Sequence, residues 1–229
     1  TQEDMALPFV RILGQLSPQV TDGDAKYIDG AKPGMIYNTV TSECFDGKKG
    51  IKVIPCYYKK DFPEWSDRGD GPGAPVAVHL PNSPVIATGK RDGSKIRLPN
   101  GNYLEETASY YVLVQTKAGG MTPALITMKS TQLNVSKKWN SMMKTIQIPD
   151  GKGGMAIPPM HGVVYNLQSV LQKNDKGSWY GWSVTQDRIM GQEDKSLYLT
   201  AKDFNSTAAK GNVQTKADVE EKAKDSTPY

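Results

Sequence analysis

Alternation of apolar and polar side chains predicts that β-strands make up most of this chain. Six segments combine alternation with β-branched and aromatic residues and are bounded by Gly, Pro, Asn or Asp. They cover residues 35–40, 50–62, 107–116, 123–131, 161–172 and 178–186. The last two flank the turn at residues 174–177, where Gly177 suits the left-handed conformation of a short loop, so we expect them to form a hairpin.

A different periodicity between the fourth and fifth segments predicts a helix. Apolar side chains recur there at spacings of three and four residues, which places them on one helical face. These residues are Val135, Trp139, Met142, Met143 and Ile146. Ser130 or Thr131 is the expected N-cap, and Pro149 follows the last turn. A second helix is expected at residues 193–209.

Residues 66–101 are rich in glycine and proline, so we expect a long irregular insertion there. Short strands are expected within it only at residues 75–80 and 85–88. Four basic residues fall between Lys90 and Arg97. Loops of this length inside a domain are uncommon, and they tend to be functional or mobile.

The order of these elements is that of an OB-fold. Three strands, a helix and two closing strands predict a mostly β Greek-key barrel whose helix lies between strands three and four. This helix position favours the OB-fold over an immunoglobulin-like sandwich. We expect one OB-like domain over residues 1–209, with an N-terminal extension and the insertion at 66–101. A polar, flexible tail is expected at residues 210–229.

The composition is that of a soluble globular protein, with 38% hydrophobic and 23% charged residues and a formal net charge of +4. We expect neither a membrane span nor a secretion signal, because no apolar run is long enough for either. Cys44 and Cys56 are expected to be free thiols in a reducing cytoplasm, with a disulfide across a hairpin as the alternative.

Residues that could support catalysis or hold a metal are sparse. His79 and His161 are the two histidines, and neither lies in a motif that activates a nucleophile or binds zinc. The run Asp150-Gly-Lys-Gly-Gly154 lacks the spacing of a phosphate-binding loop. We therefore expect no enzymatic activity, no metal and no other cofactor.

The distribution of charge is more informative than its total. Residues 107–149 contain five lysines and no Asp or Glu, although 24 acidic residues in 229 would place about four or five in such a window. We expect this segment to project positive potential without a local counter-charge. Such a surface suits a polyanion better than a small metabolite.

Nucleic-acid binding requires cations that replace counterions and flat side chains on which bases stack. Both occur together near residues 57–68 and 173–182, so we predict a basic groove that binds a single DNA strand without sequence preference. The predicted binding residues are Tyr58, Lys59, Lys60, Trp65, Lys129, Lys137, Lys138, Lys144, Lys176, Tyr180 and Trp182. Five neutralised phosphates would give log K against log salt a slope of about −3.5.

Several short motifs resemble those of a group of tailed-bacteriophage single-stranded DNA-binding proteins associated with replication. They include Lys129-Ser-Thr-Gln-Leu133, Lys137-Lys-Trp-Asn140 and Asn174-Asp-Lys-Gly-Ser-Trp-Tyr-Gly-Trp182, and related pieces spread over most of residues 7–205. The resemblance implies an OB-like core and a replication or recombination role in the host cytoplasm, with single-stranded DNA and phage replication proteins as partners. The nearly neutral segment 217–229 departs from the acidic tail of many strand-binding proteins.

Two other classes of protein remain open. A virion component, either capsid-decorating or tail-associated, would also suit a mostly β chain with Gly- and Pro-rich loops and no catalytic motif. A small nuclease or recombination mediator would need a cluster of carboxylates for a divalent metal, and the spacing of Asp and Glu provides none.

Overall fold

The computed structural model describes residues 7–67, 74–175, 177–211 and 213 of the chain. Its strands are β1 (Val10–Ile12), β2 (Ile36–Asn38), β3 (Cys44–Phe45), β4 (Ile51–Trp65), β5 (Ala77–His79), β6 (Lys90–Asp92), β7 (Lys95–Arg97), β8 (Tyr103–Glu105), β9 (Thr107–Gln115), β10 (Met121–Lys129), β11 (Ile148–Pro149), β12 (Met155–Ala156), β13 (Val163–Asn174) and β14 (Gly177–Ile189). Its helices are α1 (Pro84–Thr88), α2 (Leu133–Thr145) and α3 (Lys195–Ala209), with 3-10 turns η2 (Pro18–Val20), η3 (Ser130–Gln132), η4 (Met160–Gly162) and η5 (Gln192–Asp194).

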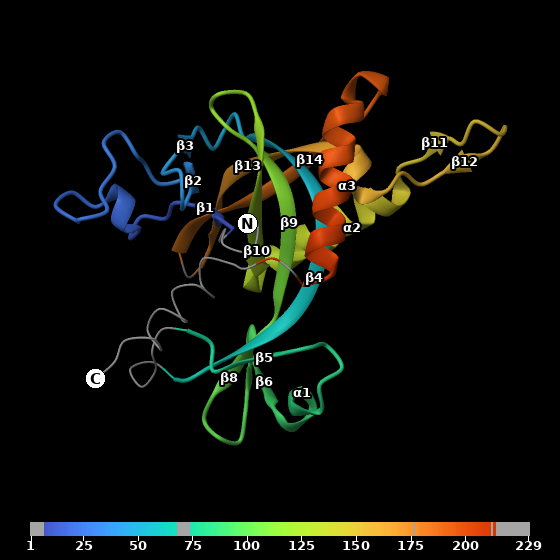
Figure 1. The fold of residues 1–229 in the computed structure, drawn as a ribbon. Helices are drawn as coiled ribbons and strands as arrows, with labels where there is room; N and C mark the ends of the chain where they lie inside the picture. The colour runs from blue at the N-terminus through green and yellow to red at the C-terminus, as the bar shows by residue number, and fades with distance from the viewer. Residues whose placement is uncertain (1–6, 68–73, 176, 212, 214–229) are drawn as a thin grey trace, which may run out of the picture.

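Five long strands form a curled antiparallel half-barrel in the order β10-β9-β4-β13-β14 (Figure 1). Three consecutive strands make a meander, α2 follows, and the last two strands return to pair with the other edge of β4. This is the connectivity of an OB-fold, with α2 between the third and fourth barrel strands. The mostly β, OB-like prediction is therefore confirmed.

The barrel is not closed by a ladder between its two edge strands. In the described residues β14 pairs only with β13, and a glutamine from η3 bridges the opening. The Trp182 N–H of β14 donates to Gln132 Oε1 at 2.8 Å. On the other edge, Phe9 forms a parallel bridge with Leu125 of β10, so the N-terminal segment extends that side. The result is an open mouth between the N-terminal sheet and the β13–β14 hairpin.

The interior of the half-barrel is packed around an aromatic cluster. Trp139 of α2 is fully buried and stacks on Tyr110 of β9, with ring centroids 4.3 Å apart. The Tyr110 hydroxyl lies 2.7 Å from Ser136 Oγ, so its polar atom is satisfied inside the core. The predicted apolar face of the helix is thus confirmed. Its predicted N-caps are wrong, because neither Ser130 nor Thr131 caps a helix, and the 3-10 turn η3 precedes α2.

A bulge in β4 decides which side chains face outward. Pro55 pairs with Val112 and Tyr57 pairs with Tyr111, so Cys56 is an extra residue without a cross-strand partner. Because side chains alternate between faces, one extra residue reverses the alternation beyond it. Tyr58 therefore joins the interior cluster, whereas Tyr57 lies on the outer face.

The outer face is covered in part by α3, which lies along β4 and β9 (Figure 1). Ala201 of α3 packs with Ile54, Cys56 and Leu113 in a second apolar cluster. Burial raises the pKa of the Cys56 thiol to about 12. Cys44 and Cys56 are both free, as predicted. None of the described helices is both long and apolar enough to cross a membrane.

The insertion after β4 is more ordered than the sequence indicated. Its strands β5 and β8 pair with the end of β4, and β7 and β6 extend that sheet below the half-barrel (Figure 1). The strand predicted at residues 85–88 is wrong, because Pro84 begins the short helix α1 there. The buried Glu64 carboxylate holds the insertion together, accepting a hydrogen bond from Asn102 at 2.6 Å and lying 2.7 Å from His79 Nε2. Hydrogen bonds from Asn102 and then His79 lower the pKa of Glu64.

Two smaller elements flank the half-barrel. The N-terminal sheet β1-β2-β3 lies on one side, and the β11–β12 hairpin projects from the other (Figure 1). The second predicted helix, at residues 193–209, forms as η5 followed by α3. The tail predicted at residues 210–229 falls almost entirely outside the described residues.

Candidate nucleic-acid interface

A cavity of about 880 Å³ lies on the outer face of β4, β9 and β10, beyond the end of α3. We call it the outer-face groove. Its lining residues are Phe9, Val10, Arg11, Tyr57, Lys59, Asp61, Pro63, Trp65, Pro75, Val78, Glu105, Thr107, Ser109, Tyr111, Leu125, Thr127, Lys129, Ala208, Ala209, Gly211 and Val213. In OB-folds the face formed by the second and third strands, here β9 and β10, is the one that binds oligonucleotides.

Aromatic rings line the groove along the strand direction. Tyr57 and Tyr111 are cross-strand neighbours whose ring centroids lie 5.7 Å apart. Trp65 lies further along β4, and Phe9 enters from the N-terminal segment. Tyr57 and Trp65 are half-buried, so each ring is anchored by protein on one side and accessible on another. Such rings suit base stacking.

Three cations line the same groove, and two of them have carboxylate partners. Lys59 Nζ lies 3.1 Å from Asp61 Oδ2, and Lys129 Nζ lies 2.7 Å from Glu105 Oε2. Arg11 lies over the ring of Phe9, with its guanidinium carbon 5.6 Å from the ring centroid. Burial lowers the pKa of Lys59, but hydrogen bonding and Coulombic attraction to Asp61 outweigh burial, so that its pKa is raised overall.

The groove is therefore less basic than the sequence indicated. Arg11, Lys59 and Lys129 face Asp61 and Glu105, which leaves a formal charge of +1. The expectation that the acid-free segment lacks a local counter-charge is wrong for Lys129. Glu105 precedes the acid-free window by two residues, and β9 pairs with β10 so that Lys129 lies opposite Thr107.

The structure brings together three of the predicted binding residues, Lys59, Trp65 and Lys129. Lys129 Nζ lies 6.0 Å from the centroid of the Trp65 ring, a cation–π distance. Tyr58 instead packs against Tyr110 with centroids 5.0 Å apart, because the bulge turns it inward. Lys60 likewise faces away from the groove and pairs with Glu106 at 2.6 Å.

The other predicted lysines do not line the groove. Lys137, Lys138 and Lys144 are exposed on α2, and none of them lines the groove. Lys176 lies outside the described residues. These positions add to the positive potential of the molecule without forming one channel with the groove.

The two aromatic residues predicted on β14 have different environments. Trp182 is 4% exposed and belongs to the interior cluster, so the stacking role predicted for it is wrong. It lies opposite Ser169 on the concave face of the sheet, where α2 and β1 contact β14. Tyr180 is half-buried and lines a separate cavity at the barrel mouth.

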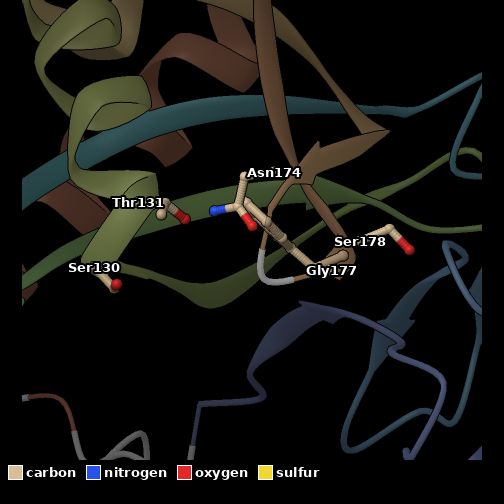
Figure 2. Close-up of a pocket in the computed structure, with 6 residues that line it drawn as sticks. Ser130, Thr131, Asn174, Gly177 and Ser178 are labelled. Carbon is tan, nitrogen blue, oxygen red and sulfur yellow. The ribbon is translucent and has the colours of Figure 1, made fainter.

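A smaller pocket of about 320 Å³ lies where the end of β13 and the start of β14 approach the start of η3. Figure 2 shows Ser130 and Thr131 on one side of it and Asn174, Gly177 and Ser178 of the hairpin on the other. Ser130 adjoins Lys129, so the pocket lies near the β10 end of the outer-face groove. Its described lining combines these polar residues with the indole of Trp179 and carries no charge.

Four aromatic or basic residues of the groove were not among the predicted binding residues: Phe9, Arg11, Tyr57 and Tyr111. The tyrosines were visible in strand segments, but the bulge that turns Tyr57 outward has no clear signal in the sequence. Arg11 is the one basic residue in the segment 1–20, which could have marked it for attention.

No group of three or more His, Cys, Asp or Glu side chains suited to a metal ion occurs in the part of the chain that the structure describes. His161 is buried against Tyr198 of α3, with centroids 5.1 Å apart. Burial and then the charge of Lys202 lower the pKa of His161. His79 is engaged by Glu64 in the insertion.

Comparison with known proteins places these features in a family. The family model described as Pam3 phage gp34-like protein matches residues 1–214, which include the half-barrel and every residue of the groove. Neither the curated proteins nor the solved structures contain a match to the chain. The match confirms the relation to phage proteins, whereas single-stranded DNA binding stays a prediction.

Proposed function

The chain belongs to the Pam3 phage gp34-like protein family, and on that premise we propose that it binds single-stranded DNA without sequence preference. It acts in replication or recombination of phage DNA in the host cytoplasm, alongside other phage replication proteins. It binds the strand rather than transforming it, so it is not an enzyme and uses no cofactor.

The outer-face groove is the observation that supports this proposal. Tyr57, Trp65 and Tyr111 offer ring surfaces in the same cavity as Arg11 and Lys129. Rings favour unpaired strands, since bases in a duplex are already stacked on one another. The mixture of rings and cations therefore suits single-stranded DNA better than a duplex or a compact anion.

Binding requires an exchange of partners within the groove. Lys59 and Lys129 are held by Asp61 and Glu105, so a phosphate must compete with a carboxylate at each ammonium group. The Lys129 side chain is 52% exposed and that of its partner Glu105 is 15% exposed, whereas Lys59 is 37% and Asp61 10% exposed. Exposed ion pairs contribute little to stability, and a buried carboxylate depends more on its partner. The exchange therefore costs less at Lys129 than at Lys59, and the carboxylates limit binding.

A fluorescence anisotropy titration tests the proposal. The labelled ligand is an oligo(dT) at low salt, with a duplex of equal length as competitor. We expect saturable binding to oligo(dT) and weaker competition by the duplex. Tyr57→Ala should reduce affinity by about 1–3 kcal/mol, the range for one stacked base. Tyr27→Ala, which removes an exposed tyrosine outside the groove, is the matched control.

A virion component is the second candidate, because one observation favours protein–protein contact. Val76, Val78 and Leu80 are each more than half exposed and alternate along β5 and its flanks, so they share one face. If the protein is found in purified particles by mass spectrometry and shows no affinity for oligo(dT), the virion function replaces DNA binding.

A further inference from the structure

A second large cavity, of about 860 Å³, lies at the open mouth of the half-barrel. We call it the mouth cavity. It separates the N-terminal segment from the β13–β14 hairpin and shares no residue with the outer-face groove. Its lining residues are Gly30, Lys32, Pro33, Gly34, Met35, Asp46, Gly47, Lys48, Ser169, Val170, Leu171 and Tyr180. Its volume lies within the range of small-molecule sites, about 300–1,000 Å³.

Two glycines allow the wall of this cavity to close against an aromatic ring. A Cβ at Gly34 would lie 2.6 Å from Tyr180 Cε1, so the tyrosine ring packs directly on backbone. A Cβ at Gly47 would lie 1.9 Å from the Gly34 carbonyl oxygen, so the backbone at Gly47 packs directly against the backbone at Gly34. Tyr180 is thereby held in place with part of its surface accessible.

The chemistry of the lining combines ring, hydroxyl and ammonium groups. Ser169 is 5% exposed, and its hydroxyl has no hydrogen-bond partner among the described residues. Lys32 and Lys48 are exposed at the rim. Asp46 is the one carboxylate in the described lining, and its Oδ1 accepts the backbone N–H of Lys48 at 2.8 Å. Leu171, 62% exposed, adds an apolar surface beside Tyr180, its cross-strand neighbour.

The mouth cavity and the outer-face groove lie close to opposite ends of one short protein segment, residues 11–13. Arg11 of β1 lines the groove, and two residues later the Leu13 carbonyl accepts the Gly34 N–H at 2.8 Å. Two residues of extended chain span about 7 Å. A DNA strand that leaves the groove at Arg11 therefore needs to extend only a short distance to reach the wall of the mouth cavity.

We propose that the mouth cavity binds one nucleotide of the strand held in the outer-face groove, with its base on Tyr180 and its phosphates near Lys32 and Lys48. Leu171 contacts the base edge, and the Ser169 hydroxyl hydrogen-bonds to a base carbonyl or ring nitrogen. This subsite rests on the proposed function, and it extends the path of the strand from the sheet to the barrel mouth.

Photo-cross-linking of the wild-type protein tests the subsite without a variant that could misfold. The probe is an oligo(dT) with 5-iodouracil at alternate positions, and cross-linked residues are identified by mass spectrometry. We expect cross-links at Tyr180 as well as at Tyr57 or Trp65 in the groove. Cross-links confined to the groove overturn the subsite and leave the proposed function intact. A protein that binds no oligonucleotide overturns both.

Charge variants provide a second readout of the subsite. Removing both rim lysines in Lys32→Gln/Lys48→Gln should flatten the slope of log K against log salt by about 1.4, the contribution of two phosphates. Lys26→Gln/Lys49→Gln removes two other exposed lysines, which do not line the mouth cavity. Equal slopes for the two double variants would overturn the subsite.

Substitution of the ring completes the test. Tyr180→Ala should lower affinity for oligo(dT) by about 5- to 150-fold, as expected when one stacking platform is lost. Tyr180→Phe retains the ring and its packing on Gly34, so it should bind nearly as tightly as the wild type. If Tyr180→Ala folds, as judged by circular dichroism, and binds as tightly as Tyr180→Phe, the stacking role is refuted.

Discussion

Replacing Glu105 by Gln should tighten DNA binding, because this carboxylate occupies the lysine that a phosphate needs. Glu105 Oε2 lies 2.7 Å from Lys129 Nζ at the edge of the outer-face groove. A phosphate oxygen bonded to the ammonium at about 2.8 Å would lie about 5 Å from the carboxylate. Two unit charges at that distance repel by about 0.8 kcal/mol at the dielectric constant of water, which is a lower limit because the Glu105 side chain is only 15% exposed.

The substitution Glu105→Gln should therefore raise affinity for oligo(dT) by a factor of about four or more at low salt. The matched control is Glu106→Gln, which changes the net charge equally but removes the partner of Lys60 on the opposite side of the strand. Anisotropy titrations of the two variants and the wild type, in one buffer, give the comparison. If Glu106→Gln tightens binding as much as Glu105→Gln, the gain reflects net charge alone and the groove is not the binding surface.

Three further predictions concern stability. Hydrogen bonding by Arg188 lowers the pKa of the Asp194 carboxyl to about 2, so its stabilisation is complete above the ordinary pKa near 3.8 and is lost as pH falls through 2. Thermal unfolding of Asp194→Asn should therefore vary less with pH between 5 and 2 than that of the wild type, and parallel curves would refute this role. Gly47→Ala should cost about 1–3 kcal/mol of unfolding free energy in urea titrations, because its Cβ would overlap the Gly34 carbonyl; an unchanged midpoint would contradict the close packing. Trp182→Phe should lower the unfolding free energy by about 0.5–3 kcal/mol and leave oligo(dT) affinity unchanged, since this indole is buried; weakened binding by a folded variant would restore its predicted role.

The strand order of the half-barrel could be predicted because each strand and the helix α2 carry their own local pattern. The face of the sheet on which each side chain of β4 lies could not be predicted. Cys56 fits a regular alternation in the sequence, yet in the structure it is the extra residue of a bulge. Bulges depend on how two strands pair, so Tyr58 was assigned to the surface and Tyr57 was overlooked.

Charge was misjudged for a related reason. A window of residues 107–149 includes Lys129 but not Glu105. In the structure, Lys129 pairs with Thr107 at the start of β9, and Glu105 lies just before β9, so the two side chains meet. The segment at residues 85–88 was similarly misread. Its apolar residues suit a strand, but Pro84 provides the fixed φ with which a short helix begins.

The salt dependence of oligo(dT) binding, followed by tryptophan fluorescence, tests the central claim most directly. Lys59→Gln/Lys129→Gln removes two cations from the groove, whereas Lys138→Gln/Lys144→Gln removes two exposed cations of α2. We predict that the groove variant flattens the slope of log K against log salt by about 1.4 and that the α2 variant leaves it close to that of the wild type. Equal slopes for the two variants, or no fluorescence change for the wild type at low salt, would contradict strand binding in the groove.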